Sequence, residues 1–334
     1  MSAAVHISVF AKTDLGQTRD HNEDSFLVAD LSTGVASLMP DVREHDVGPR
    51  GSLFVVADGM GGAAAGELAS AMATDVIWQH LLTTWANDTD LSGERLALRM
   101  REAVERANAE IFQYAEEHPE VRGMGTTLTM VGVFGSDAFL AQIGDSRAYL
   151  VRGGHTFQLT RDQSLTQRLV DAGELSEEEA ERSERRNIIL QALGPDVQVR
   201  VDLSQQPLRR GDVLIMCSDG LSGLVKRSEI GEVAGRVPEL SALCSALIDL
   251  ANARGGPDNI TVVAARFSGD GLAEPAADDE VGYHNLPVED DATVELPAVP
   301  PVVAPEFRSG SPRTIMISAV VLAVLIALVL ILLF

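Results

Sequence analysis

The sequence predicts a folded domain of strands and helices, followed by an acidic linker and one membrane-spanning helix. Three observations lead to this prediction. Several short apolar runs end at an aspartate beside a glycine, the pattern of a buried strand that runs into a turn. Two longer stretches, residues 63–85 and 92–117, have the pattern of helices. The last run, residues 315–334, is uncharged and almost wholly Ile, Leu, Val and Ala.

Composition excludes several classes of protein. The 334-residue chain has 49 acidic and 26 basic residues and a formal charge of −23, the opposite of a nucleic-acid binder. Its two cysteines, Cys217 and Cys244, have no paired spacing, so we expect neither a disulfide framework nor a zinc motif. The first residues lack the basic start and apolar run of a signal peptide. We therefore expect the main domain in a reducing, cytosolic compartment.

The first element, residues 11–30, has the pattern of a strand, a turn and a second strand. Its turn carries Arg19 four residues before the pair Glu23 and Asp24. Taken alone, this is typical of a solvated hairpin with a salt bridge. The same residues also suit a site in which the carboxylates bind a hard cation and the arginine binds a phosphate. Residues 31–50 that follow have the pattern of a loop.

The second element, residues 53–62, is an apolar strand that runs into Asp58 and three glycines. A carboxylate on such a turn can grip a metal, because glycines let the backbone approach a ligand closely. The glycines also fit the G-x-G-x-x-A pattern of dinucleotide-binding loops. Asp58 has the wrong charge for a pyrophosphate there, and Gln79 stands where a ribose-binding acid is expected. By itself, the segment leaves a metal site, a nucleotide loop and a plain turn open.

Three further aspartates flank predicted strands. Asp145 follows residues 139–143, Asp219 follows residues 212–217, and Asp258 precedes residues 260–267. One such aspartate usually marks only a turn, but the repetition with glycine nearby suggests a single acidic centre. A carboxylate set without His or Cys suits Mg²⁺ or Mn²⁺. Two such ions can lower the pKa of a shared water and make it a nucleophile.

Taken together, the motifs resemble the metal-dependent protein phosphatases (the PPM family, protein phosphatase 2C-like), and in particular their bacterial Ser/Thr phosphatase branch. The resemblance spans residues 6–267. It rests on the order of six segments, residues 19–24, 58–62, 123–127, 143–147, 217–221 and 256–262. It implies an α+β fold, a four-layer αββα sandwich of two antiparallel sheets flanked by helices. Segment 165–186, which by itself is either a mobile flap or a surface excursion, would match the variable flap of the family.

The resemblance also implies roles for particular residues. Asp58 would bridge two metal ions, Glu23 and the Gly59 carbonyl would complete one site, and Asp219 and Asp258 would hold the other. The ions would be Mn²⁺ or Mg²⁺.

Three more positions match the family. Asp145 would bind a weaker third ion, shared with Asp219. Asp24 would orient the attacking water, and Arg19 would bind the substrate phosphate; these two are the predicted catalytic residues. Many eukaryotic members place a histidine general acid where this chain has Met60, which cannot donate a proton. His21 is the one nearby histidine in the sequence.

The predicted function is hydrolysis of phosphoserine and phosphothreonine in proteins by a metal-activated water, opposing a cognate Ser/Thr kinase. The phosphatase domain would span residues 6–268, the acidic, Pro-rich disordered linker residues 269–313, and the transmembrane helix residues 314–334. Arginines before the helix predict a cytoplasmic domain anchored in the cell membrane by a single C-terminal span. No nucleic-acid partner is expected. The alternative function is that of a catalytically inactive binding or regulatory module on the same fold.

Overall fold

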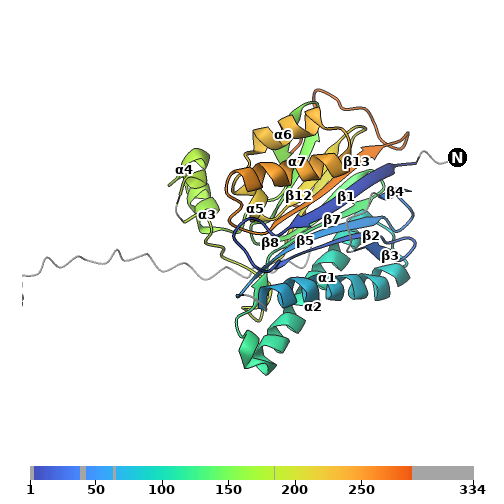
Figure 1. The fold of residues 1–334 in the computed structure, drawn as a ribbon. Helices are drawn as coiled ribbons and strands as arrows, with labels where there is room; N and C mark the ends of the chain where they lie inside the picture. The colour runs from blue at the N-terminus through green and yellow to red at the C-terminus, as the bar shows by residue number, and fades with distance from the viewer. Residues whose placement is uncertain (1–3, 38–42, 63–64, 184, 288–334) are drawn as a thin grey trace, which may run out of the picture. The chain divides into compact units, whose positions relative to one another are not determined.

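The computed structural model describes residues 4–37, 43–62, 65–183 and 185–287. Two antiparallel sheets pack face to face (Figure 1). The six-stranded sheet has the order β10-β9-β12-β13-β1-β4. Its strands are β1 (His6–Asp14), β4 (Arg43–Asp46), β9 (Arg147–Arg152), β10 (His155–Gln158), β12 (Val213–Cys217) and β13 (Ile260–Ser268).

The seven-stranded sheet has the order β11-β8-β7-β5-β2-β3, and β6 pairs with β5 beyond that path. Its strands are β2 (Asp24–Asp30), β3 (Val35–Ser37), β5 (Ser52–Met60), β6 (Gly125–Thr126), β7 (Leu128–Phe134), β8 (Asp137–Ile143) and β11 (Asp202–Pro207). The central strand β5 is apolar on both faces because each face is covered.

Helices cover the outer face of each sheet. On the seven-stranded sheet lie α1 (Ala65–Thr83) and α2 (Gly93–Glu117). On the six-stranded sheet lie α5 (Asp219–Ser222), α6 (Arg227–Arg236) and α7 (Leu240–Ala253). Two short helices, α3 (Leu165–Asp171) and α4 (Glu177–Glu181), stand apart from the sheets (Figure 1). The 3₁₀ turns are η1 (Trp85–Asn87) and η2 (Pro119–Val121).

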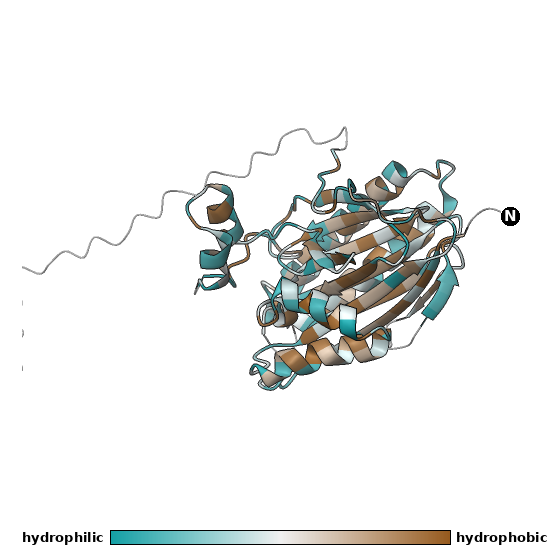
Figure 2. Ribbon diagram, turned by 90° about the horizontal axis from the view of Figure 1, so that it is seen from above, coloured by the Kyte–Doolittle hydropathy of each residue, from teal (hydrophilic) through white to brown (hydrophobic). Residues whose placement is uncertain are grey.

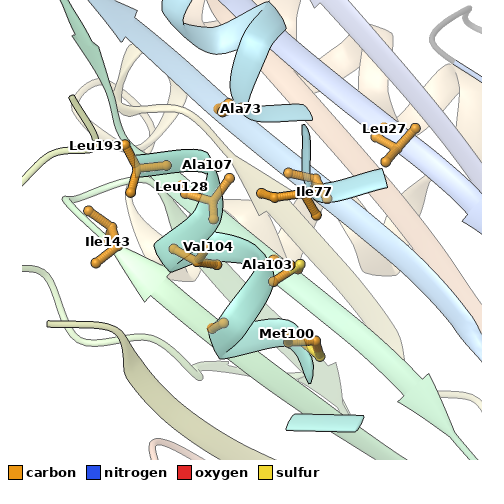
Figure 3. Close-up of a cluster of buried hydrophobic side chains, with 14 of the residues drawn as sticks. Leu27, Ala73, Ile77, Met100, Ala103, Val104, Ala107, Leu128, Ile143 and Leu193 are labelled. Atoms are coloured by element: carbon orange, nitrogen blue, oxygen red, sulfur yellow. The ribbon is translucent and has the colours of Figure 1, made fainter. Parts of the chain in front are cut away.

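Three buried apolar clusters fill the spaces between these layers. One lies between the two sheets, and one lies under α6 and α7. The third joins α1 and α2 to the seven-stranded sheet, where Ile77 and Val104 meet Leu128 (Figure 3). Apolar residues run along the strands, and polar residues gather at the turns (Figure 2). The predicted αββα sandwich is therefore confirmed.

Capping residues set the starts of two helices, of which α2 was predicted from the sequence. Ser92 accepts a hydrogen bond from the Arg95 N–H at 3.2 Å, and α2 begins at the next residue. Ser176 and Glu179 form a capping box at the start of α4. Segment 31–50 is not wholly a loop, because it contributes the short edge strands β3 and β4.

The folded unit extends beyond the predicted boundary at residue 268. Residues 269–287, which we call the C-terminal strap, pack on the domain; this corrects the prediction that the disordered linker begins at residue 269. Leu272 is 2% exposed, and Asp279 forms a bidentate pair with Arg209 at 2.6–3.1 Å. The Leu286 N–H donates to the Leu203 carbonyl of edge strand β11 at 2.8 Å. Backbone pairing with this edge and a buried leucine order the strap despite its acidic composition.

Across the described ranges, we find no helix that is both long enough and apolar enough to cross a membrane. The predicted transmembrane helix, residues 314–334, lies outside those ranges, as does the linker from residue 288 onward.

Candidate metal centre

Strand pairing brings the predicted acids to one end of the sandwich. Asp24 at the start of β2 lies opposite Asp58 near the end of β5. In the other sheet, β12 ends beside the start of β13. Ser218 follows the last residue of β12, and Asp219 begins α5 directly after it; Asp258 lies just before β13. Asp145 lies in the turn that carries the chain from β8 in one sheet to β9 in the other. Five segments distant in sequence therefore meet here.

Two threonines hold the backbone of Asp58. Its carbonyl oxygen accepts hydrogen bonds from the Thr127 N–H at 2.8 Å and from the Thr126 hydroxyl at 3.0 Å. The Asp58 N–H donates to Thr127 Oγ1 at 3.2 Å. The main chain of the predicted bridging residue is thus fixed by Thr126 at the end of β6 and by Thr127, which joins β6 to β7.

Gly59 sits where three backbones cross. Its N–H donates to the Glu23 carbonyl at 3.1 Å. A Cβ at Gly59 would lie 2.2 Å from the carbonyl oxygen of Gly66, which is far inside contact distance. Only glycine therefore lets the start of α1 approach the end of β5 this closely. The structure thus shows the close backbone approach that the glycine was predicted to allow. Binding of a metal ion by the Gly59 carbonyl stays a prediction.

Asn259 joins the first turn to the last strand. Its Oδ1 accepts from the Glu23 N–H at 2.8 Å, and its Nδ2 donates to the carbonyls of Leu15 and His21, each at 3.0 Å. The Asn259 N–H donates to Asp258 Oδ1 at 2.8 Å. One buried amide thus positions two of the predicted ligands, Glu23 and Asp258, relative to each other.

Arg19 lies at the rim of the same site. Its Nη2 is 2.8 Å from Asp258 Oδ2, and its Nη1 is 3.8 Å from Glu23 Oε2. The guanidinium remains partly exposed. It therefore places positive charge beside the acids and within reach of a bound anion.

Asp24 is buried and is held by the opposite sheet. The Ser218 hydroxyl donates to Asp24 Oδ2 at 2.7 Å and accepts from the Thr261 N–H at 3.0 Å. Burial raises the pKa of Asp24 to about 7, and the charges of Asp219 and Asp258 add to this rise. Its Oδ1 is buried and has no hydrogen-bond partner. The structure therefore leaves one carboxylate oxygen of Asp24 with unused acceptor capacity.

Crowding of negative charge raises the pKa of the other acids as well. Burial, and then the charges of Asp24, Asp219, Asp145 and Asp258, raise the pKa of Asp58 well above its usual value. Burial and the charge of Asp258 raise the pKa of Asp219, although a hydrogen bond with Asp58 opposes the rise. These carboxyls are therefore near enough to act on one another, as a shared site requires.

Asp145 belongs to the same group. Burial and the Asp219 charge raise its pKa to about 8. The neighbouring Ser146 hydroxyl lies 2.7 Å from Thr127 Oγ1, which ties the Asp145 turn to the Asp58 strand end. Arg147, two residues on, is committed to Asp162 by contacts of 2.6–3.0 Å. Asp145 and Asp219, the two residues predicted to share a third ion, are thus close enough for the charge of Asp219 to raise the pKa of Asp145.

The donor set fits a hard divalent cation. In the part of the chain that the structure describes, no three His, Cys, Asp or Glu side chains already have the spacing that holds an ion. However, the side chains gathered here are carboxylates, their charges repel one another, and the buried Asp24 Oδ1 lacks a partner. Divalent cations that prefer oxygen ligands would relieve both features.

A pocket of about 540 Å³ opens beside these acids. Asp145, Asp219 and Asp258 are among the residues that line it. Residues of the predicted flap, among them Thr166 and Arg182, also line it, as do Lys226 and Arg227 at the start of α6. A ligand that occupies the pocket can therefore touch the acidic centre and the flap at once.

Comparison with known proteins decides the family. The protein phosphatase 2C family model matches residues 40–250. The serine/threonine phosphatase Stp of Listeria monocytogenes is 38% identical over 253 residues, which is 75% of this chain and 92% of Stp. This chain belongs to the protein phosphatase 2C family. The family and the enzyme class predicted from the sequence, a protein-serine/threonine phosphatase, are thereby confirmed.

Solved structures of phosphatases agree with the fold. The crystal structure of the Mycobacterium tuberculosis phosphatase PstP has 36% identity and a TM-score of 0.65, covering 81% of this chain and 100% of that one. A structure of the PstP catalytic domain in complex with two manganese ions has 35% identity and a TM-score of 0.64, covering 79% and 99%. At the level of the family, this confirms the predicted cofactors, Mn²⁺ or Mg²⁺.

Other predicted features of the phosphatase have mixed outcomes. The predicted ligands Glu23, Asp58, Asp219 and Asp258 lie at one site. His21 is exposed, and its contact with the site is through its main-chain carbonyl. Ser218 and Asn259, which hold the acids in place, were not predicted. Their only signal in the sequence is that each adjoins a predicted ligand.

Proposed function

We propose that this chain is a Mn²⁺- or Mg²⁺-dependent phosphatase that hydrolyses phosphoserine and phosphothreonine in proteins. The observation that carries the proposal is the convergence of five carboxylate-bearing segments, with Arg19 at their rim, at one end of the sandwich. The relatives named above are serine/threonine phosphatases, which supports this substrate class.

The carboxylates divide into ligand sets by position. In the proposal, Asp58 would be shared by two ion sites; Glu23 and the Gly59 carbonyl would belong to one, and Asp219 and Asp258 to the other. Asp145 would contribute to a weaker third site, shared with Asp219. When bound, such cations neutralise phosphate charge and lower the pKa of a water that serves as nucleophile.

Two residues act on the reactants. The unpartnered Oδ1 of Asp24 accepts a hydrogen bond from the attacking water, while Ser218 holds Oδ2 and so fixes the carboxylate. Arg19 donates to the non-bridging phosphate oxygens and aligns the phosphorus for in-line attack. Met60 at the end of β5 cannot protonate the leaving group, so the serine or threonine oxygen would take its proton from a water or from another group at the site.

A cysteine-based mechanism is disfavoured by the environment of the thiol. Cys217 is fully buried, and burial raises its pKa to about 12. A thiol with so little thiolate at neutral pH is a poor nucleophile.

Turnover of para-nitrophenyl phosphate and of a phosphothreonine peptide by the full chain tests the proposal. We expect activity with Mn²⁺ that is lost on chelation and restored by fresh Mn²⁺. Asp58→Asn should reduce kcat by at least about 100-fold without unfolding the domain. Asp46→Asn, an equal charge change at the exposed edge strand β4, is the matched control.

Two outcomes oppose the proposal. Chelator-resistant turnover would exclude a metal-dependent reaction. No turnover with either ion, in a protein that is folded and binds Mn²⁺, would favour the inactive binding module.

We further propose that the domain is anchored to the cytoplasmic face of the cell membrane by residues 314–334 and opposes a Ser/Thr kinase. The uncharged apolar run and the arginines before it support the anchor. Deletion of residues 315–334 should move the protein to the soluble fraction of cells with its turnover unchanged. If the deleted form stays with the membrane fraction, the anchor lies elsewhere.

A further inference from the structure

The pocket beside the acidic centre has an unusual charge distribution for this chain. Besides Arg147 and Arg161, four basic side chains line it; we call these four the cationic wall. They are Arg182, Arg186, Lys226 and Arg227. None of the four forms an ion pair with a described residue, and all are exposed. In a chain with 49 acidic and 26 basic residues, four unpaired cations at one pocket are unexpected.

The other charges near the pocket are already committed. Arg147 is paired with Asp162 at 2.6 Å, and Arg161 is paired with Asp171 at 2.5 Å. Apart from these and from the acids of the metal centre, Glu177 is the one acidic residue among the described residues that line the pocket. The wall therefore retains a net positive charge that no ion pair with a described residue neutralises.

The wall has two parts on two different elements. Arg182 and Arg186 follow α4 in the flap, whereas Lys226 and Arg227 lie at the start of α6. The backbone of the second part is held in place. Glu229 accepts a hydrogen bond from the Lys226 N–H at 3.0 Å, and Arg254 holds Glu229 by contacts of 2.6 and 2.8 Å. Glu229 is thereby occupied by Arg254 and does not pair with the wall.

We propose that the cationic wall binds acidic side chains that flank the phosphorylated residue of a substrate protein. The inference rests on the proposed function, because it assumes that the phosphate occupies the metal centre, whose acids line the same pocket. Carboxylates spaced along an extended peptide match cations that come from two separate elements. A single compact anion would instead require donors that converge from one place, such as a bidentate fork.

Steady-state kinetics of the full chain with matched phosphothreonine peptides tests the inference. Four peptides would differ only in flanking positions, which carry Asp, uncharged residues, Lys or a second phosphothreonine. With Mn²⁺ at low salt, kcat/KM for the Asp peptide should exceed that for the uncharged peptide by about tenfold, or about 1.4 kcal/mol. The preference should shrink at high salt, since the contacts are exposed.

Charge reversal identifies the wall as the source of the preference. In the double variant Arg182→Glu/Arg227→Glu, the ratio of kcat/KM for the Asp and Lys peptides should fall at least tenfold, and the Lys peptide should become the better substrate. The matched control is Arg106→Glu/Arg122→Glu, whose side chains are exposed on or beside α2, outside the pocket lining. It should keep the wild-type ratio, and thermal unfolding would verify that both variants are folded.

The results separate the inference from the function on which it rests. If no peptide and no para-nitrophenyl phosphate is hydrolysed with Mn²⁺, the proposed function fails. Hydrolysis of all peptides at equal rates would overturn the inference alone. So would a preference confined to the doubly phosphorylated peptide, or an equal loss in the reversal and control variants.

Discussion

At the scale of single residues, the Ser218 hydroxyl connects the two sheets at the metal centre. It donates to Asp24 on β2 of one sheet and accepts from the Thr261 N–H on β13 of the other. Ser218 is fully buried, so water cannot replace either contact. The position of the Asp24 carboxylate therefore depends on how the sheets are packed, and not only on strand β2.

Ser218→Ala should lower kcat by about 10- to 100-fold, as the loss of a residue that orients a ligand or base commonly does. It should also cost about 1–3 kcal/mol of unfolding free energy, because it leaves a buried carboxylate oxygen and a buried N–H without their partner. Ser204→Ala removes another buried hydroxyl, one bonded to the Leu159 carbonyl away from the site. Kinetics and thermal unfolding of both variants should show stability loss in each but activity loss only in Ser218→Ala; equal activity in both would contradict this role.

The acids were predictable from sequence, and the residues that hold them were not. Asp58 and Asp219 each stand beside a glycine near the end of an apolar strand, a pattern that predicts both location and chemistry. Ser218 and Asn259 have no such pattern, since serine and asparagine are common in turns for local reasons. Their roles arise from contacts between segments far apart in sequence, such as Asn259 with Leu15.

At the scale of elements, the C-terminal strap belongs to the catalytic domain. It runs from β13 to the edge of β11, where the Gln205 N–H donates to the His284 carbonyl at 3.0 Å. It also brings Tyr283 to the pocket lining, with its hydroxyl donating to Asp202 at 2.7 Å. Sequence patterns missed the strap because acidic, Pro- and Ala-rich segments usually lack enough apolar residues to fold. Here the burial of Leu272, the ion pair between Asp279 and Arg209, and the backbone hydrogen bonds to β11 hold the strap on the domain.

A chain that ends at residue 268 should be less stable than one that ends at residue 287. The shorter chain loses the burial of Leu272, which contributes about 2 kcal/mol, and the pairing of Asp279 with Arg209. For a domain of this size, each kcal/mol corresponds to about 2–4 °C, so we expect Tm to fall by at least about 4–8 °C. Scanning calorimetry of the two chains measures this. Equal Tm values would show that the strap does not contribute to the stability of the domain.

At the scale of the whole molecule, the clustered acids make stability depend on pH and on metal together. The pKa of Asp24 is raised to about 7 and that of Asp145 to about 8, from an ordinary value of 3.8. The folded state therefore binds protons that the unfolded state releases. The contribution of these groups to stability is full below about pH 4 and is lost as the pH rises through about 7–8.

Without metal, the unfolding temperature of the full chain should fall between about pH 5 and pH 8.5, and Mn²⁺ should raise it most at the upper end of that range. The physical reason is that a cation replaces the protons which the crowded carboxylates otherwise need. Thermal unfolding with chelator and with Mn²⁺ at each pH tests this expectation. A Mn²⁺ effect that is the same at both ends would argue against the carboxylates as its site.

The number of Mn²⁺ ions bound per chain tests the central claim most directly. Titration calorimetry of the metal-free protein should give two tightly bound ions, with a weaker third, and Asp46→Asn should behave like the wild type. Asp58→Asn should lose tight binding of at least one ion, because it removes the charge proposed to bridge the pair. If Asp58→Asn binds two ions as tightly as the wild type, Asp58 is not the bridge and the metal centre is not where five strand ends converge.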